Sequence, residues 1–168
     1  DIYMLSDQDD VWLPEKVEKS FETLKQEKAD LVFGDLTVVD KDLNVIHESF
    51  GNLKKLDHKI HKCIGTPEIN YLYNCVTGCT IMSKKKYINS ILPIPYESRH
   101  VAHDHWMALT VGLCGGKLAY MPEKYILYRQ HSDNEIGTAR RTGQLTRFKQ
   151  VRELFLEVKQ GVFGTYVE

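Results

Sequence analysis

Three aspartates stand close together near the start of the chain. Asp7, Asp9 and Asp10 follow a short apolar run, residues 2–5, which predicts a buried strand. Carboxylates this close repel one another, and in an extended segment Asp7 and Asp9 project to the same side. Such a pair suits a hard divalent ion, Mg²⁺ or Mn²⁺, whose other ligands are phosphate oxygens and water. The alternative is a solvated turn in which Asp10 caps the following helix.

A second group of candidate residues contains His100, His103, Asp104 and His105. The histidines suggest zinc, but their spacing differs from the H-x-H-x-D-H pattern of metallo-hydrolases, and ligand types alone do not define a metal site. Asp104 stands where a helix is expected to begin and could act as a general base toward a hydroxyl. Trp106 could stack on a sugar, or it could pack in the core.

A third group lies at residues 128–131, at the end of an expected strand. Arg129 offers a planar fork of donors for phosphate oxygens, and a neutral histidine such as His131 is a frequent metal ligand. An ordinary exposed polar turn is the alternative interpretation.

The elements that must position these residues follow the order strand, helix, strand and then a mixture, which favours an α/β fold. In such folds ligands bind beyond the carboxyl ends of the strands, where the aspartates stand. A helix is expected from Pro14 to about Glu27, with Lys16 facing water; its apolar stripe consists of Leu13, Val17, Phe21 and Leu24.

Hydrophobic patterning predicts the remaining elements. Strands are expected at 31–33, 80–82, 118–121 and 125–128, a hairpin at 37–46, and helices at 85–91, 104–114 and 146–159. Residues 48–70 are expected to form a loop with a short helix. The cysteines form no C-x-x-C pair and are interpreted as reduced, buried thiols; they are Cys63, Cys75, Cys79 and Cys114.

The composition is that of one globular domain. The chain has 168 residues, of which 42% are hydrophobic and 27% charged. Its net charge of −1 argues against a protein that binds nucleic acid through charge. No apolar run is long enough to span a membrane. Residues 138–168 form a basic amphipathic tail, expected to be helical, which could lie on an anionic membrane or pack against the domain.

Four segments in order carry a resemblance to a known family. They are S-D-Q-D-D-V-W-L-P-E-K at 6–16, V-T-G-C-T at 76–80, H-D-H-W at 103–106 and Y-R-Q-H-S-D-N-E-I-G at 128–137. Over residues 1–137 the chain resembles the family-2 glycosyltransferases, in their rhamnosyltransferase-like branch. The resemblance implies part of a GT-A fold, a Rossmann-like α/β domain with a mixed sheet flanked by helices. It also implies a divalent metal and transfer of a sugar from a nucleotide-sugar with inversion at the anomeric carbon.

Carried over by position, the resemblance assigns roles to five residues. It implies that Asp9 and His131 are ligands of Mn²⁺ or Mg²⁺, and that Asp7 and Arg129 lie at the donor diphosphate. Asp104 falls where the family keeps its catalytic base.

The resemblance also implies three residues that bind the acceptor. Two of them, Thr77 and Gly78, stand in the loop beside the donor sugar, and the third is Trp106. His105 departs from the pattern, since a tryptophan is common there in this branch. The implied reaction moves a sugar, rhamnose by analogy with the branch, from a dTDP- or UDP-sugar. The acceptor would be a hydroxyl of a cell-surface polysaccharide or of a lipid-linked glycan, in the cytoplasm at the inner face of the membrane.

The resemblance begins after the half of the family's domain that binds most of the nucleotide. We therefore expect the isolated chain to be a weak or inactive transferase. We also expect that a further N-terminal segment, or a second copy in a homodimer, covers an exposed apolar edge of the sheet. The alternative function is a truncated, non-catalytic module of the same fold that binds sugar or metal.

Overall fold

The computed structural model describes residues 1–65, 74–94 and 102–130. Several predictions fall outside these residues: His100, His131, the loop 131–137 and the tail 138–168 with its helix 146–159.

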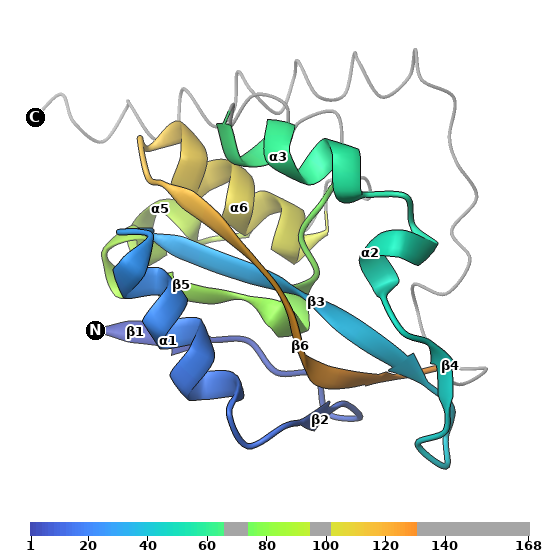
Figure 1. The fold of residues 1–168 in the computed structure, drawn as a ribbon. Helices are drawn as coiled ribbons and strands as arrows, with labels where there is room; N and C mark the ends of the chain where they lie inside the picture. Colours follow the sequence, from blue (N-terminus) through green and yellow to red (C-terminus); the bar gives the residue numbers. More distant parts are fainter. Residues whose placement is uncertain (66–73, 95–101, 131–168) are drawn as a thin grey trace, which may run out of the picture.

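A mixed sheet flanked by helices makes up the described part of the chain (Figure 1). Its strands are β1 (Ile2–Met4), β2 (Val11–Trp12), β3 (Leu31–Val39), β4 (Val45–His47), β5 (Met82–Lys84) and β6 (Leu118–Arg129). The helices are α1 (Lys16–Gln26), α2 (Phe50–Leu53), α3 (Asp57–Gly65), α5 (Ile88–Ile91) and α6 (His103–Leu113), with 3₁₀ turns η1 (Gly78–Thr80) and η2 (Lys85–Tyr87).

The strand order is β1-β5-β3-β6-β2, and β4 pairs with one end of β3. The β3 and β6 strands run parallel, whereas every other pair in the sheet is antiparallel. The predicted α/β class, with a mixed sheet and flanking helices, is therefore confirmed.

Each face of the sheet has its own core. Side chains alternate along a strand, so Leu31 and Phe33 enter the cluster beneath α3, α5 and α6, while Val32 enters the cluster beneath α1. Figure 1 shows α1 on the opposite face of the sheet from α3 and α6. Helix α6 is buried along most of its length, and Trp106 lies in the first cluster at 7% exposure.

Two long strands replace elements that were predicted as separate pieces. The β3 strand runs through Gly34 and Asp35, where a strand end was expected, and β6 runs through Pro122. The register between the two strands shifts next to Gly34. The Asp35 carboxylate accepts hydrogen bonds from Ser49 Oγ and the Gly51 N–H, so this buried polar side chain is satisfied within the strand.

The buried face of α1 differs from the predicted one. Lys16 is 2% exposed and lies on the buried side with Ser20 and Leu24, whereas Val17 and Phe21 are 49% and 37% exposed. In the described part of the chain the sheet ends at β1, so no further strand covers these two apolar side chains.

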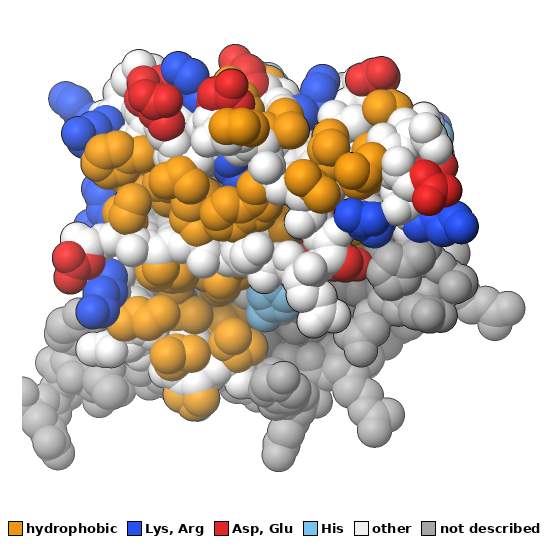
Figure 2. Space-filling view, turned by 90° about the horizontal axis from the view of Figure 1, so that it is seen from below, with side chains coloured by type: hydrophobic (Ala, Val, Ile, Leu, Met, Phe, Trp, Pro, Cys, Tyr) orange, Lys and Arg blue, Asp and Glu red, His pale blue; other side chains and the backbone are white. Residues whose placement is uncertain are grey.

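The strand predicted as buried at residues 2–5 is in fact the edge strand β1. It pairs with β5 along one side, and Ile2 is 40% exposed. Figure 2, which views the molecule from below, shows hydrophobic side chains gathered across the surface on this side.

Within the described residues, no helix combines the length and the apolar character needed to cross a bilayer.

Candidate functional site

The acidic turn, residues 6–10, connects β1 to β2 and is fastened to the end of β6. Strand β2 pairs with β6 through Val11 and Trp12. Beyond that pairing, the Arg129 backbone N–H donates to Asp10 Oδ1 at 3.2 Å, and its Nε donates to the Asp9 carbonyl at 3.0 Å. Arg129 Nη1 donates to the Lys41 carbonyl at 2.7 Å. Three donors of Arg129 therefore hold the acidic turn and the β3–β4 hairpin together.

One group of side chains in the described part of the chain could hold a metal ion. Asp7, Asp10 and Cys79 place their ligand atoms within 4.8 Å of one another. Asp10 Oδ2 is buried and, among the described residues, has no hydrogen-bond partner. A buried carboxylate oxygen without a donor is costly, and a cation would satisfy it.

Burial and nearby charges disfavour the ionised form of the carboxylates in this group. Burial raises the pKa of Asp7, and the negative charges of Asp9 and Asp104 raise it further, although His103 and Lys16 act in the opposite direction. Asp7 therefore lies within electrostatic reach of both Asp9 and Asp104.

Burial also raises the pKa values of the other two members of the group, Asp10 and Cys79. Burial raises the pKa of Asp10, while the Cys79 thiol and the Arg129 backbone N–H oppose the rise. Burial, followed by the charge of Asp10, also raises the pKa of Cys79, so its sulfur is held as a thiol. When no cation is bound, the carboxylate oxygens of Asp7 and Asp10 are therefore better available as metal ligands than the protonated sulfur of Cys79. Oxygen ligands favour a hard ion.

Lys16 supplies positive charge beneath the acidic turn. Its Nζ donates to the Cys79 carbonyl at 2.7 Å and lies 3.2 Å from the centroid of the Trp12 ring. Burial lowers the pKa of Lys16 to about 8, although the nearby charges of Asp10 and Asp7 favour the ammonium form.

The η1 turn links the acidic turn to Asp104. On one side, Cys79 belongs to the group with Asp7 and Asp10. On the other, the Gly78 N–H donates to Asp104 Oδ2 at 3.1 Å. A side chain at Gly78 would not fit in the present arrangement, because a Cβ there would lie 2.7 Å from His103 Nε2.

Asp104 is held at the first turn of α6 and is 8% exposed. Besides the bond from Gly78, its Oδ1 accepts from Asn74 Nδ2 at 3.2 Å and from the His105 N–H at 2.6 Å. Three donors fix the orientation of this carboxylate.

Some candidate residues lie elsewhere than the sequence suggested. Trp106 is not an exposed platform: its Nε1 donates to the Ile91 carbonyl at 2.8 Å within the core, as the packing alternative has it. Thr77 lies in the site turn, and its carbonyl accepts from Thr80 Oγ1 at 2.6 Å. Asp10 does not cap α1, whose N-cap is Glu15.

The zinc hypothesis gains no support from the described residues. His103 and His105 belong to no group of three candidate ligands within residues 1–65, 74–94 and 102–130, and His100 lies outside them.

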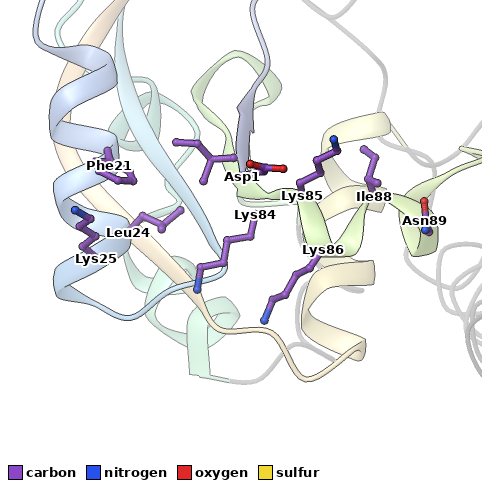
Figure 3. A pocket seen from close by; sticks show the side chains of 10 residues that line it. Asp1, Phe21, Leu24, Lys25, Lys84, Lys85, Lys86, Ile88 and Asn89 are labelled. Carbon is purple, nitrogen blue, oxygen red and sulfur yellow. The ribbon is translucent and has the colours of Figure 1, made fainter.

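A cleft of about 740 Å³ lies away from the acidic turn, at the start of β1 (Figure 3). Its apolar lining includes Ile2, Phe21 and Leu24, and four lysines surround it: Lys25, Lys84, Lys85 and Lys86. It contains none of the candidate catalytic or metal-binding residues.

Sequence reasoning missed four contributors to the site. Asp10 and Cys79 stand in the ligand group with Asp7, where the Asp7–Asp9 pair was expected. Lys16 and Asn74 are the other two.

Lys16 was predicted to be exposed to solvent because its side chain is charged, although its position lies on the buried face of the helix. The only signal for it was the spacing of four between Lys16, Ser20 and Leu24, which puts all three on one helical face. Asn74 stands apart from any motif, and no sequence signal indicated it.

No family model matches this chain, and no curated protein matches it.

Proposed function

We propose that this chain is the metal-binding and catalytic part of an inverting glycosyltransferase with a GT-A fold. The observation that carries the proposal is the η1 turn, which touches the acidic group through Cys79 and Asp104 through Gly78. One side of this short turn thus contacts a group able to hold a cation, and the other side contacts a fixed carboxylate. A cation there could stabilise a leaving group while the carboxylate accepts a proton from a hydroxyl.

The donor set fits Mn²⁺ or Mg²⁺. Asp7 and Asp10 offer carboxylate oxygens, and the unsatisfied Oδ2 of Asp10 is the atom most in need of a cation. Asp9 and His131 remain proposed ligands. The chemistry that a divalent ion held by these residues would supply is stabilisation of the negative charge on a nucleoside diphosphate leaving group.

Asp104 is the proposed general base. Its carboxylate would take the proton of the acceptor hydroxyl as that oxygen attacks the anomeric carbon from the face opposite the diphosphate. The bonds from Gly78, Asn74 and His105 orient the carboxylate for this transfer.

The proposed donor is a dTDP- or UDP-sugar, with rhamnose as the sugar. The proposed acceptor is a cell-surface polysaccharide or a lipid-linked glycan at the inner face of the membrane, where the basic tail would bring the enzyme. A further segment or a second copy would cover the apolar surface beside β1, where Ile2, Val17 and Phe21 are exposed.

The metal site is tested by titrating the 168-residue chain with Mn²⁺ and measuring free Mn²⁺ by electron paramagnetic resonance. Asp10→Asn should weaken binding by at least about tenfold, because it removes a ligand charge. Asp42→Asn is the matched control, since Asp42 is an exposed carboxylate in the β3–β4 hairpin. Equal affinities for the wild type and Asp10→Asn would contradict the site.

The catalytic role is tested by a sugar-transfer assay with a dTDP- or UDP-sugar as the donor. Asp104→Asn should lower sugar transfer by at least about a hundredfold while Mn²⁺ affinity stays within about twofold. Asn74→Ala removes one hydrogen bond to Asp104 but keeps the carboxylate, and it should retain most of the transfer. If both variants lose transfer equally, Asp104 acts through structure rather than as a base.

A non-catalytic binding module is the second candidate, and one observation favours it. The Asp104 carboxylate is 8% exposed and accepts three hydrogen bonds, so it could serve only to fix the η1 turn. In that case Mn²⁺ and a nucleotide-sugar bind, no sugar is transferred, and Asp104→Asn changes stability alone.

A further inference from the structure

Two cysteines from different segments meet in the core. Cys63, on α3, and Cys75, three residues before η1, have their Sγ atoms 2.8 Å apart in a thiol–thiol hydrogen bond. They are 0% and 4% exposed and belong to the apolar cluster that also contains Ile60 and Val76.

This pair differs from the other two cysteines of the chain. Cys79 lies beside Asp10 in the acidic group, and Cys114 is half-buried after α6. None of the four is in a disulfide in the structure. Only Cys63 and Cys75 place two thiols in direct contact, so the described structure offers a single candidate for an intramolecular redox pair.

The two thiols have distinct chemical characters. The hydrogen bond with Cys63 lowers the pKa of Cys75, because it stabilises the Cys75 thiolate, although burial opposes this. The same bond and burial raise the pKa of Cys63. Of the two, Cys75 is the thiol that is more readily deprotonated, which suits the role of nucleophile. The Cys63 sulfur, 2.8 Å away, is in place to react with an oxidised Cys75.

We propose that Cys63 and Cys75 are a redox site that a hydroperoxide converts into an intramolecular disulfide. The Cys75 thiolate attacks one peroxide oxygen, the O–O bond breaks, and Cys75 becomes a sulfenic acid as hydroxide leaves. The Cys63 sulfur then attacks the Cys75 sulfur, and the sulfenic hydroxyl leaves with the Cys63 proton as water. In sum, two thiols and one hydrogen peroxide give one disulfide and two waters.

The change in geometry is small. A disulfide bond is about 2.05 Å long, so the sulfurs need to approach by less than about 1 Å from their present separation. The bond would tie α3 to the segment that carries Asn74, the residue next to Cys75, whose amide donates to Asp104. The redox site therefore adjoins the candidate functional site but does not depend on its function.

The test treats the folded, reduced 168-residue chain with hydrogen peroxide, unfolds it in denaturant with an alkylating reagent, and maps the cysteines by mass spectrometry after proteolysis. The expected product is a peptide pair joined through Cys63 and Cys75, lighter by two hydrogen atoms than the reduced pair. Cys63→Ser and Cys75→Ser should each abolish the joined pair, and Cys114→Ser should leave it unchanged.

Three outcomes would overturn the proposal. Cys63 and Cys75 could both remain fully alkylated at peroxide levels that oxidise Cys114. Cys75 could accumulate as sulfinic acid while Cys63 stays a thiol. Alternatively, the joined peptides could involve another cysteine or a second chain, which non-reducing electrophoresis would reveal.

Discussion

At the scale of single residues, the site balances an exposed carboxylate, Asp7, and a half-buried one, Asp10, against the buried amine of Lys16. Lys16 lies close enough to Asp7 and Asp10 for their charges to affect its pKa. Its amine donates to the Cys79 carbonyl, which lies in the turn that also bonds Asp104. A lysine in this position stabilises the carboxylates when no cation is bound, and it repels a cation that binds them.

Replacing Lys16 with Met tests this balance. We expect Lys16→Met to tighten Mn²⁺ binding by about 1 kcal/mol, or roughly fivefold, because it removes a positive charge from the neighbourhood of Asp7 and Asp10. The measurement is a Mn²⁺ titration at pH 7.5 and low salt, with Lys19→Met as the control, because Lys19 is 42% exposed and pairs with Glu22. Weaker binding by Lys16→Met would show that the amine supports the metal site instead.

The sequence predicted part of the site at this scale. The motif at 76–80 and Asp104 were assigned to one site, and they are in direct hydrogen-bond contact. Lys16 was assigned to solvent, because periodicity arguments treat a lysine as water-facing unless a partner is visible. Its partner is the Cys79 carbonyl, which lies 63 positions away in the sequence.

At the scale of elements, an ion cluster at the start of β3 holds three strands together. Asp30 accepts from Lys84 at 3.0 Å, from Lys86 at 2.9 Å and from the Lys117 N–H at 3.0 Å. Burial alone would raise the pKa of Asp30, but the bonds from Lys86, Lys117 and Lys84 outweigh it and lower the pKa to about 2.

This shift predicts an acid-sensitive contribution to folding. Because the folded-state pKa lies below the ordinary value of 3.8, the stabilisation is present above about pH 4 and is lost as the pH falls toward 2. Asp30→Asn should lower the free energy of unfolding by about 1–2 kcal/mol at pH 6 and by much less at pH 2.5. Urea unfolding at both values checks this, and an equal loss at both would contradict it.

The turn after α6 offers a second test of an element. A Cβ at Gly116 would lie 2.7 Å from Tyr87 Oη and 2.8 Å from the Val111 carbonyl oxygen, which is backbone and cannot easily move. Gly116→Ala should cost about 2–3 kcal/mol in the free energy of unfolding.

The neighbouring glycine is the matched control for that variant. Gly115 has φ +77° and open space around it, so Gly115→Ala should cost only about 1 kcal/mol, from backbone strain. Denaturant unfolding compares the two variants. If Gly115→Ala proves the more damaging, close packing at Gly116 is not what limits this turn.

The sequence predicted helices α1 and α6 closely but divided the long strands. Gly34 and Asp35 are turn-forming residues, and nothing local shows that Ser49 and Gly51 will satisfy the Asp35 carboxylate. Pro122 likewise separated two predicted strands, although β6 continues through it. Local patterns do not contain the long-range contacts that keep these strands whole.

At the scale of the whole molecule, one side of the sheet is left apolar and unpaired in the described structure. Strand β1 is at the edge, and its exposed Ile2 lines one cleft with the exposed Phe21 of α1. Val17, also exposed, lies one helical turn before Phe21 on the same face of α1. An exposed strand edge beside apolar side chains favours association with another surface.

We therefore expect the purified 168-residue chain to self-associate through this side. Val17→Gln should lower the weight-average mass measured by sedimentation equilibrium and change stability by no more than about 0.5 kcal/mol. Leu53→Gln, at a 44% exposed leucine on α2, should leave the association unchanged. A wild-type chain that stays monomeric at high concentration would contradict the prediction.

The bonds from Arg129 to the acidic turn also bear on how the protein is made. Asp9 and Asp10 leave the ribosome well before the residue that fastens them, which follows about 120 positions later. A nascent chain arrested before β6 would therefore carry every aspartate of the turn and still lack the contacts that hold the proposed metal site together. Ion affinity should appear abruptly, in chains long enough for Arg129 to have cleared the exit tunnel.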